Sequence, residues 1–189
     1  MIHTYMDDIL ISTTNDSGLH QRIVHNVLDA LENASFYLQV AKCVFEATHI
    51  EYLGLLIDGN TLKIDPTKLK GIAEWPEKLT TPKQVRQFLG VVGYHLPWIE
   101  GFAHIAHPLT NLQKKDVPFI WDDSCETAVR TLTHRVTSDP VLWQPDHNHP
   151  FLLEVDASQY TTSAILWQED DKGKKRAIGY DSSTLSDAE

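Results

Sequence analysis

Two adjacent carboxylates, Asp7 and Asp8, lie within the stretch HTYMDDILIST, between two short apolar segments. Carboxylates that converge on Mg²⁺ can support two-metal phosphoryl transfer. An Asp-Asp pair taken alone is far more often a solvated turn, because acidic residues favour turns. Residues 2–6 and 9–13 flank the pair and are rich in strand-forming side chains. We therefore expect a hairpin with Asp7-Asp8 at its turn.

The charge is unevenly distributed along the chain. The net charge is −10, which taken globally argues against a nucleic-acid binder, since phosphates are contacted by Lys and Arg. Residues 63–86, however, carry six Lys and Arg side chains against three acids. Such a stretch can be a solvated helix face or a track for phosphates, and the charge pattern alone leaves both open.

Several classes of protein are disfavoured. No apolar run approaches the roughly 20 residues of a membrane helix, and no basic segment precedes an apolar one at the N-terminus. We therefore expect an intracellular protein, cytoplasmic or nuclear, with no membrane partner. Cys43 and Cys125 lie far apart and lack partners at zinc spacing, which predicts free thiols. Two pairs of closely spaced histidines lack a third ligand, so a metal site is not expected there.

The periodicity predicts an α+β part, a helical part and a β-rich part. Apolar residues at spacings of three and four from Leu19 to Leu31 predict a helix capped by Asp16 or Ser17. Further helices are predicted at residues 65–75, 80–93, 101–113 and 122–138, the third broken or kinked by Pro108. Strands are predicted at residues 36–40, 43–47, 50–57, 61–64, 151–155, 161–168 and 176–180.

Tyr5-Met6-Asp7-Asp8 resembles the Tyr-X-Asp-Asp motif of reverse transcriptases. Further motifs match in order along nearly the whole chain: Tyr37-Leu38, Lys42-Cys43, Glu51-Tyr52-Leu53-Gly54, Trp75-Pro76, Phe88-Leu89-Gly90, Pro140-Val141-Leu142 and Asp156-Ala157-Ser158. Together they resemble the polymerase of Ty3/gypsy-type retrotransposons. The resemblance implies an α+β fold, with a partial reverse-transcriptase palm and helical thumb followed by a truncated RNase H-like α/β unit.

Four segments follow from this resemblance. Residues 1–64 correspond to the C-terminal part of the palm and residues 65–115 to a thumb-like helical module. Residues 116–149 correspond to the connection and residues 150–189 to the start of the RNase H-like domain.

The resemblance also implies roles for individual residues. Asp7 and Asp8 are implied as catalytic Mg²⁺ ligands, and Asp156 as the first carboxylate of an RNase H metal site, although an acid at a strand end can also simply cap a loop. Contacts with the primer or nucleic acid are implied for Tyr5, Met6, Tyr52, Leu53, Gly54, Lys68, Lys70, Lys83 and Arg86. The implied partners are an RNA–DNA hybrid or primer-template duplex and the rest of the Pol polyprotein.

The sequence departs from the family pattern in ways that bear on activity. The family places a further metal-binding aspartate upstream and more RNase H carboxylates downstream, so we expect this chain alone to be inactive. Tyr94-His95-Leu96-Pro97-Trp98 stands where the thumb usually has Tyr-Tyr-Arg-Arg-Phe. We predict a fragment of a retrotransposon RNA-directed DNA polymerase with RNase H. The alternative is a non-catalytic nucleic-acid or protein binding module derived from a retroelement.

Overall fold

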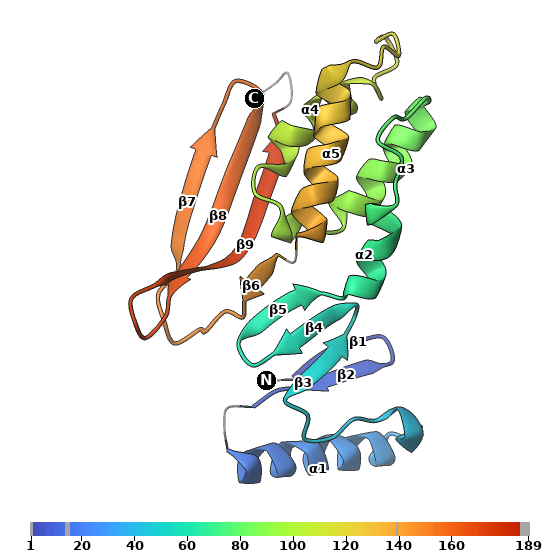
Figure 1. Ribbon diagram of the computed structural model, residues 1–189. Coiled ribbons are helices and arrows are strands. Elements are labelled where there is room, and N and C mark those ends of the chain that lie inside the picture. Colours follow the sequence, from blue (N-terminus) through green and yellow to red (C-terminus); the bar gives the residue numbers. More distant parts are fainter. Residues whose placement is uncertain (1, 14–15, 139, 186–189) are drawn as a thin grey trace. The chain divides into compact units, whose positions relative to one another are not determined.

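The computed structural model describes residues 2–13, 16–138 and 140–185 (Figure 1). Its elements are a mixture of helices and strands, as the sequence predicts. The chain forms two compact units, residues 1–52 and residues 53–189. Each unit is described by itself below.

The first unit begins with the predicted hairpin. Strands β1 (Ile2–Tyr5) and β2 (Asp8–Ile11) pair antiparallel. Helix α1 (Ser17–Asn33) follows, and the side chain of Asp16 accepts a hydrogen bond from the backbone N–H of Leu19 at 2.9 Å. This bond satisfies one of the unpaired N–H groups of the first turn, which is why the helix begins there. The unit ends with β3 (His49–Tyr52).

The strands predicted at residues 36–40 and 43–47 are wrong. The structure describes every residue of this stretch, and its only regular element is a short 3₁₀ turn, Val40–Lys42. Tyr37 is 98% exposed and Val40 is 73% exposed. Strand-forming residues favour strands because they pack on a half-buried sheet surface, and these side chains meet no such surface.

Three strands of the second unit pair antiparallel in the order β4 (Leu55–Asp58), β5 (Thr61–Ile64) and β6 (Val141–Trp143). The predicted strand 50–57 is divided into β3 and β4, because Leu53 and Gly54 both have positive φ, 54° and 77°. Strand β6 was not predicted, since three residues are too few to display an alternation of apolar and polar side chains.

The predicted helices of the second unit are confirmed. They are α2 (Pro66–Ala73), α3 (Pro82–Gly93), α4 (Phe102–Asn111) and α5 (Asp123–Thr137). Asp65, Thr81 and Asp122 cap the first, second and fourth of these through side-chain oxygens. Helix α4 continues through Pro108 rather than ending there. Proline removes a single backbone N–H so close to the end of the helix, and the other bonds of the helix hold it together.

One hydrophobic core joins the four helices of this unit. It contains Ile64, Leu69, Ile72, Leu79, Val85, Phe88, Val92, Ile99, Ala106, Leu109, Leu112, Cys125, Ala128, Val129, Leu132 and Val136. Helix α5, predicted to belong to the connection, therefore shares its core with the predicted thumb helices α2 to α4.

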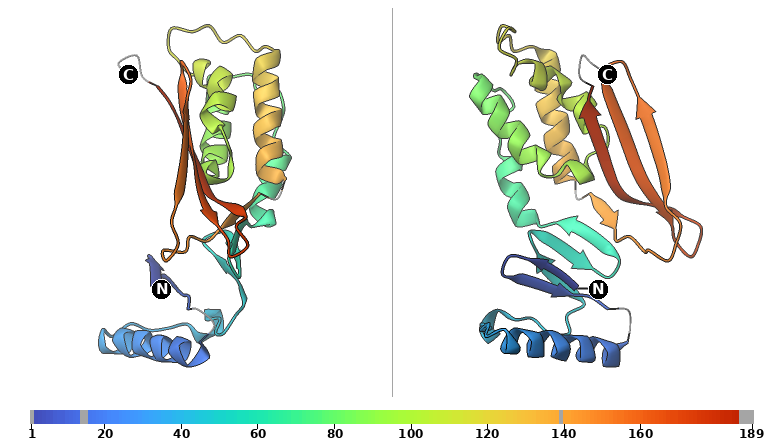
Figure 2. Two further views of the ribbon diagram at one scale, coloured as in Figure 1. Left: turned by 90° about the vertical axis from the view of Figure 1, so that its left-hand side faces the viewer. Right: turned by 180° about the vertical axis from the view of Figure 1, so that it is seen from behind.

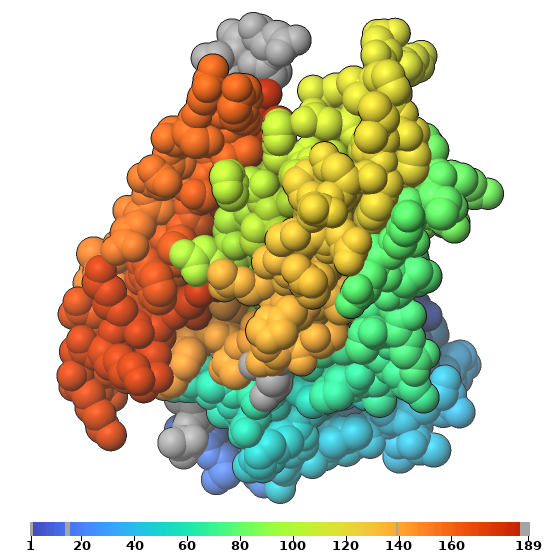
Figure 3. All heavy atoms as spheres, turned by 45° about the horizontal axis from the view of Figure 1, so that its top comes forward, coloured from blue at the N-terminus to red at the C-terminus, as the bar shows by residue number. Residues whose placement is uncertain are grey.

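A second sheet completes the unit, with antiparallel strands in the order β7 (Leu152–Ala157), β8 (Thr161–Glu169) and β9 (Lys175–Thr184). Helix α4 lies between this sheet and α5, as Figures 1 and 2 both show. In Figure 3, α5 (gold) lies between the sheet (orange and red) and α3 (green). Among the described residues, no helix is long and apolar enough to cross a membrane.

Candidate functional site

The predicted catalytic pair lies at the tip of the β1–β2 hairpin. Tyr5 pairs with Asp8 in the antiparallel register, so Met6 and Asp7 form a two-residue turn. Asp7 therefore occupies the turn itself, and Asp8 is the first residue of β2. Both aspartates are exposed. The hairpin thus presents two carboxylates at its tip, as predicted.

The turn holds its geometry against a backbone cost. Met6 has φ of 48° and is 89% exposed. Two-residue hairpin turns need a positive φ at the first position because that twist matches the flanking strands, and glycine or asparagine usually supplies it. A side chain with a Cβ costs roughly 1–2 kcal/mol in the left-handed region. The two-residue turn therefore places Asp7 beside Asp8, although Met6 is not a residue that favours the positive φ of this turn.

The carboxylates of Asp7 and Asp8 are suitable ligands for Mg²⁺, but two side chains are too few for a complete catalytic metal site. Carboxylate oxygens are the ligands that Mg²⁺ prefers, and it commonly keeps several waters besides one or two carboxylates. Within the described ranges, no three Asp, Glu, His or Cys side chains are placed to share a metal ion. Asp7 and Asp8 therefore offer part of a ligand set.

A second group of predicted residues meets in the unit formed by residues 53–189. The backbone N–H of Asp65 donates to the carbonyl of Gly54 at 3.0 Å, which ties the turn at Leu53-Gly54 to the start of α2. A β-carbon on Gly54 would lie 3.9 Å from Cγ and Cε of Lys68. Leu53, Gly54 and Lys68 thus lie together, and they line a cavity of about 440 Å³.

The capping contacts of Asp65 fix this arrangement. Its carboxylate accepts a hydrogen bond from the backbone N–H of Thr67 at 2.9 Å. The hydroxyl and backbone N–H of Thr67 lower the pKa of Asp65, and the charge of Lys68 adds to this effect. The carboxylate therefore stays ionised and anchors the first turn of α2, which carries Lys68.

The remaining predicted cations are exposed on two helices. Lys70 is on α2, whereas Lys83 and Arg86 are on the first two turns of α3. Residues three apart on a helix face the same side, so Lys83 and Arg86 form a pair. Lys68 and Lys70 are two apart and point in different directions. Tyr5, Met6 and Tyr52 belong to the other unit.

Asp156 is exposed in β7 and lies on the face of the second sheet that packs against α4. Asp156 pairs with Ser163, which pairs with Ser182 on β9. Directly paired residues of neighbouring strands share a face, and the Oγ of Ser182 accepts a hydrogen bond from the backbone N–H of Ala103 in α4 at 2.9 Å. The carboxylate therefore faces the same side as α4.

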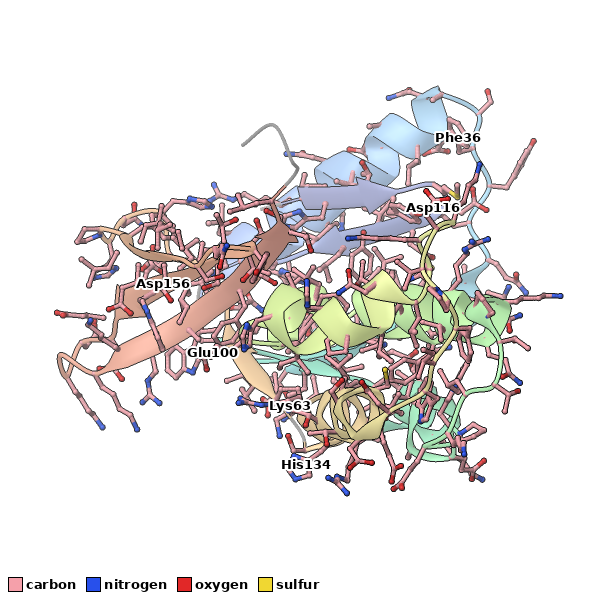
Figure 4. The ribbon with its side chains drawn as sticks, turned by 90° about the horizontal axis from the view of Figure 1, so that it is seen from above. Phe36, Lys63, Glu100, Asp116, His134 and Asp156 are labelled. Atoms are coloured by element: carbon pink, nitrogen blue, oxygen red, sulfur yellow. The ribbon has the colours of Figure 1, made fainter. Side chains whose placement is uncertain are left out.

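A cavity of about 430 Å³ lies beside Asp156, and residues before and within α4 form its other wall. Glu100 and His104 line it from that side, and Glu154 lines it from β7. Figure 4 labels Glu100 and Asp156, which both line this cavity. Glu154 already accepts hydrogen bonds from Trp167 Nε1 at 3.0 Å and from Lys175 Nζ at 2.9 Å. The sequence gives no signal for Glu100 and His104, because only the packing of α4 on the sheet brings them to Asp156.

Comparisons with known proteins match two families to separate parts of the chain. The family described as "Reverse transcriptase (RNA-dependent DNA polymerase)" matches residues 1–57. The family described as "RNase H-like domain found in reverse transcriptase" matches residues 121–189. Two structures of the foamy viral protease-reverse transcriptase, with RNA/DNA hybrid and with dsDNA, each have a TM-score of 0.78. They share 21% sequence identity and cover 98% and 99% of this chain, and 25% and 39% of their own.

Relatives of known sequence extend the match through the helical module. The Tf2-3 and Tf2-7 transposon polyproteins of Schizosaccharomyces pombe are each 34% identical over 185 residues, which is 98% of this chain. The chain spans about 14% of the length of these relatives. The resemblance to a Ty3/gypsy-type retrotransposon polymerase is thereby confirmed. The chain belongs to the reverse transcriptase family over residues 1–57 and to the RNase H-like family of reverse transcriptases over residues 121–189, as a segment related to transposon polyproteins.

Proposed function

We propose that this chain acts as part of an RNA-directed DNA polymerase with RNase H, within a longer Pol polyprotein. The observation that carries the proposal is the hairpin tip, where Met6 and Asp7 form the turn and Asp8 pairs with Tyr5. This arrangement holds two carboxylates rigidly with their oxygens in solvent. The rest of the polyprotein is the partner that would supply further ligands.

At the hairpin, Asp7 and Asp8 would contribute two carboxylates to a Mg²⁺ site. A bound Mg²⁺ stabilises the charge that develops during phosphoryl transfer. The chain's own contribution is to fix the carboxylate oxygens through the tight turn. Tyr5 and Met6, which flank or form that turn, would pack beneath and beside the primer end.

The partner proposed for the helical module is an RNA–DNA hybrid or a primer-template duplex. Lys68, Lys70, Lys83 and Arg86 are exposed on α2 and α3 and would contact phosphates. Tyr52, Leu53 and Gly54 would contact the primer end. The likeness to foamy viral structures that hold RNA/DNA hybrid and dsDNA supports this proposal.

Asp156 would serve as one carboxylate of an RNase H metal site, with Mg²⁺ as the ion. The division into palm end (1–64), thumb (65–115), connection (116–149) and RNase H start (150–189) is part of the same proposal. Cys43 and Cys125 are free thiols, which supports an intracellular location, cytoplasmic or nuclear.

Primer extension tests the polymerase role. We expect no synthesis by the isolated chain, and synthesis when the chain replaces the matching segment of a complete transposon polymerase. Asp7→Asn should abolish that synthesis, because an amide is a far weaker Mg²⁺ ligand than a carboxylate. Asp29→Asn, at an exposed position on α1, is the matched control and should retain synthesis. Full synthesis by the Asp7→Asn chimaera would contradict the role of the hairpin.

A second candidate is a non-catalytic binding module that holds nucleic acid or protein. The observation that favours it is that the described residues assemble no three-ligand metal cluster. Gel-shift titration of an RNA–DNA hybrid at two salt concentrations distinguishes a module that binds nucleic acid from one that binds protein. Charge reversal at Lys68, Lys70, Lys83 and Arg86 should weaken binding and flatten its salt dependence. Binding that survives the reversal would exclude this surface as the nucleic-acid contact.

A further inference from the structure

His95 is a buried imidazole between the end of α3 and the short 3₁₀ helix η2 (Leu96–Trp98). The residue is 6% exposed, and its Nδ1 has no hydrogen-bond partner among the residues that the structure describes. A buried ring nitrogen without a partner already costs free energy. Protonation raises that cost, because the imidazolium carries a charge and a second N–H donor into the same buried place.

The groups around His95 do not compensate for a proton. Tyr94 lies edge-on to the imidazole, with ring centroids 5.2 Å apart, and Lys68, which lines the same cavity, supplies a cation and not an acceptor. Strand β9 contacts η2, and its titratable side chains are Lys175, Arg176, Tyr180 and Asp181. Burial lowers the pKa of His95 from 6.5, and no charged group of the described residues adds to this effect or opposes it.

The backbone of His95 holds the two helices together. Its N–H donates to the carbonyl of Val92 at 2.9 Å, and its own carbonyl accepts a hydrogen bond from the N–H of Trp98 at 3.0 Å. The N–H of Ile99 donates to the carbonyl of Leu96 at 2.9 Å, and Ile99 belongs to the core of this unit. Displacing the imidazole therefore disturbs the hydrogen bonds on both sides of His95.

We propose that His95 is a pH-sensitive latch, whose protonation releases the imidazole from its buried position and opens the junction between α3 and η2. Water solvates the imidazolium in the open form, whereas burial disfavours it in the closed form. The pKa of His95 is ordinary in the open form and lower than 6.5 in the closed form. The closed form is therefore fully favoured above pH 6.5 and loses this advantage as the pH falls below that value.

Amide hydrogen exchange of the whole chain at about pH 7.5 and at about pH 5.5 tests the latch. Protection factors, corrected for the intrinsic pH dependence of exchange, report how often each hydrogen bond opens. The protection of the Trp98 and Ile99 amides should fall at the lower pH by up to about tenfold, the limit for one proton about one unit below its ordinary pKa. The amides of Leu132 and Val136 on α5 should keep their protection, because the opening is confined to the junction.

Two variants remove the titrating group, and a third serves as the control. His95→Phe and His95→Gln should each give the same Trp98 and Ile99 protection at both pH values, and either variant suffices if the other fails to fold. His134→Gln, at an exposed histidine on α5, should keep the fall of the unaltered chain. In an NMR titration, the imidazole resonance that is lost in His95→Gln should report a pKa below 6.5.

Three results would overturn the inference. They are unchanged protection of Trp98 and Ile99 at the two pH values, a fall that persists in the His95 variants, and an equal fall at Leu132 and Val136. The last result would mean that acid unfolds the whole unit and does not open the junction alone. The experiment contains no nucleic acid and no metal ion, so a failure of the latch leaves the proposed function untouched.

Discussion

The Oγ of Ser182 accepts a hydrogen bond from the backbone N–H of Ala103 at 2.9 Å, across 79 positions of the sequence. This bond ties the first turn of α4 to β9. Because Asp156 and Ser182 share a face of the sheet, the same contact determines what lies opposite Asp156. Glu100 and His104 therefore line the cavity beside this carboxylate.

Ser182→Ala should destabilise the unit formed by residues 53–189 by about 1–2 kcal/mol, the usual cost of leaving a buried N–H without its partner. Ser182 is 9% exposed, so water cannot easily replace the lost hydroxyl. Urea unfolding followed by tryptophan fluorescence measures the change. Ser183→Ala is the control, because the Ser183 hydroxyl bonds to Thr162 at an exposed position. An equal loss of unfolding free energy in the two variants would show that the hydrogen bond from Ala103 to Ser182 does not stabilise the unit more than the exposed one.

Phe88 on α3 and Leu132 on α5 belong to the same core and are both 0% exposed. Phe88→Ala should cost about 3–5 kcal/mol and Leu132→Ala about 2–5 kcal/mol, through lost burial and the cavity left behind. Val91→Ala, at a position 41% exposed on α3, should cost much less.

The sequence analysis places the thumb and the connection in separate segments. Because their helices share this core, we expect them to unfold together in one cooperative transition. Urea unfolding of the Phe88→Ala and Leu132→Ala variants should show the same single transition at lower midpoints, whether followed by fluorescence or by far-UV circular dichroism. Two transitions, each sensitive to one variant, would contradict a shared core.

Local chemistry made most helices predictable. Asp65-Pro66 and Thr81-Pro82 place a capping oxygen before a proline in the first turn, and this signal does not depend on the rest of the fold. The strands predicted at residues 36–47 were wrong because a strand needs a neighbouring strand to pair with and a surface on which to bury its side chains. The residues of the stretch alone do not show whether either is present.

The candidate sites also differ in whether they could be predicted from local sequence. The Asp7-Asp8 hairpin is local, since a two-residue turn and its flanking strands lie within eleven residues of one another, and it was predicted. The cavity lined by Leu53, Gly54 and Lys68 was not, because it depends on how α2, α3 and the turn at Gly54 converge.

Asp122 predicts how stability depends on pH. The hydroxyl of Ser124 and the backbone N–H of Cys125 donate to its carboxylate at 2.6 and 3.0 Å. These bonds lower the pKa of Asp122 from 3.8 to about 2. A lowered pKa in the folded state means that the stabilisation is complete above the unfolded value and is lost as the pH falls toward the folded value.

The urea midpoint should therefore fall as the pH drops from above 3.8 toward 2, and Asp122→Asn should remove part of this fall. Asp123→Asn, at the neighbouring position that does not cap α5, is the control and should keep the pH dependence of the unaltered chain. The same pH dependence in the chain and in Asp122→Asn would show that this cap does not contribute to it.

Met6→Gly tests whether the hairpin turn stores strain. Glycine adopts the φ of 48° without a steric cost, so the hairpin should gain up to about 1 kcal/mol once the greater freedom of the unfolded glycine is subtracted. Met6→Ala keeps a Cβ and should gain nothing. Amide hydrogen exchange of β1 and β2 measures both, and equal protection in the two variants would mean that the turn is unstrained. If the polymerase role is right, the same glycine should reduce synthesis in the chimaera, because the Met6 side chain at the tip is the part of the motif that would lie beside the primer.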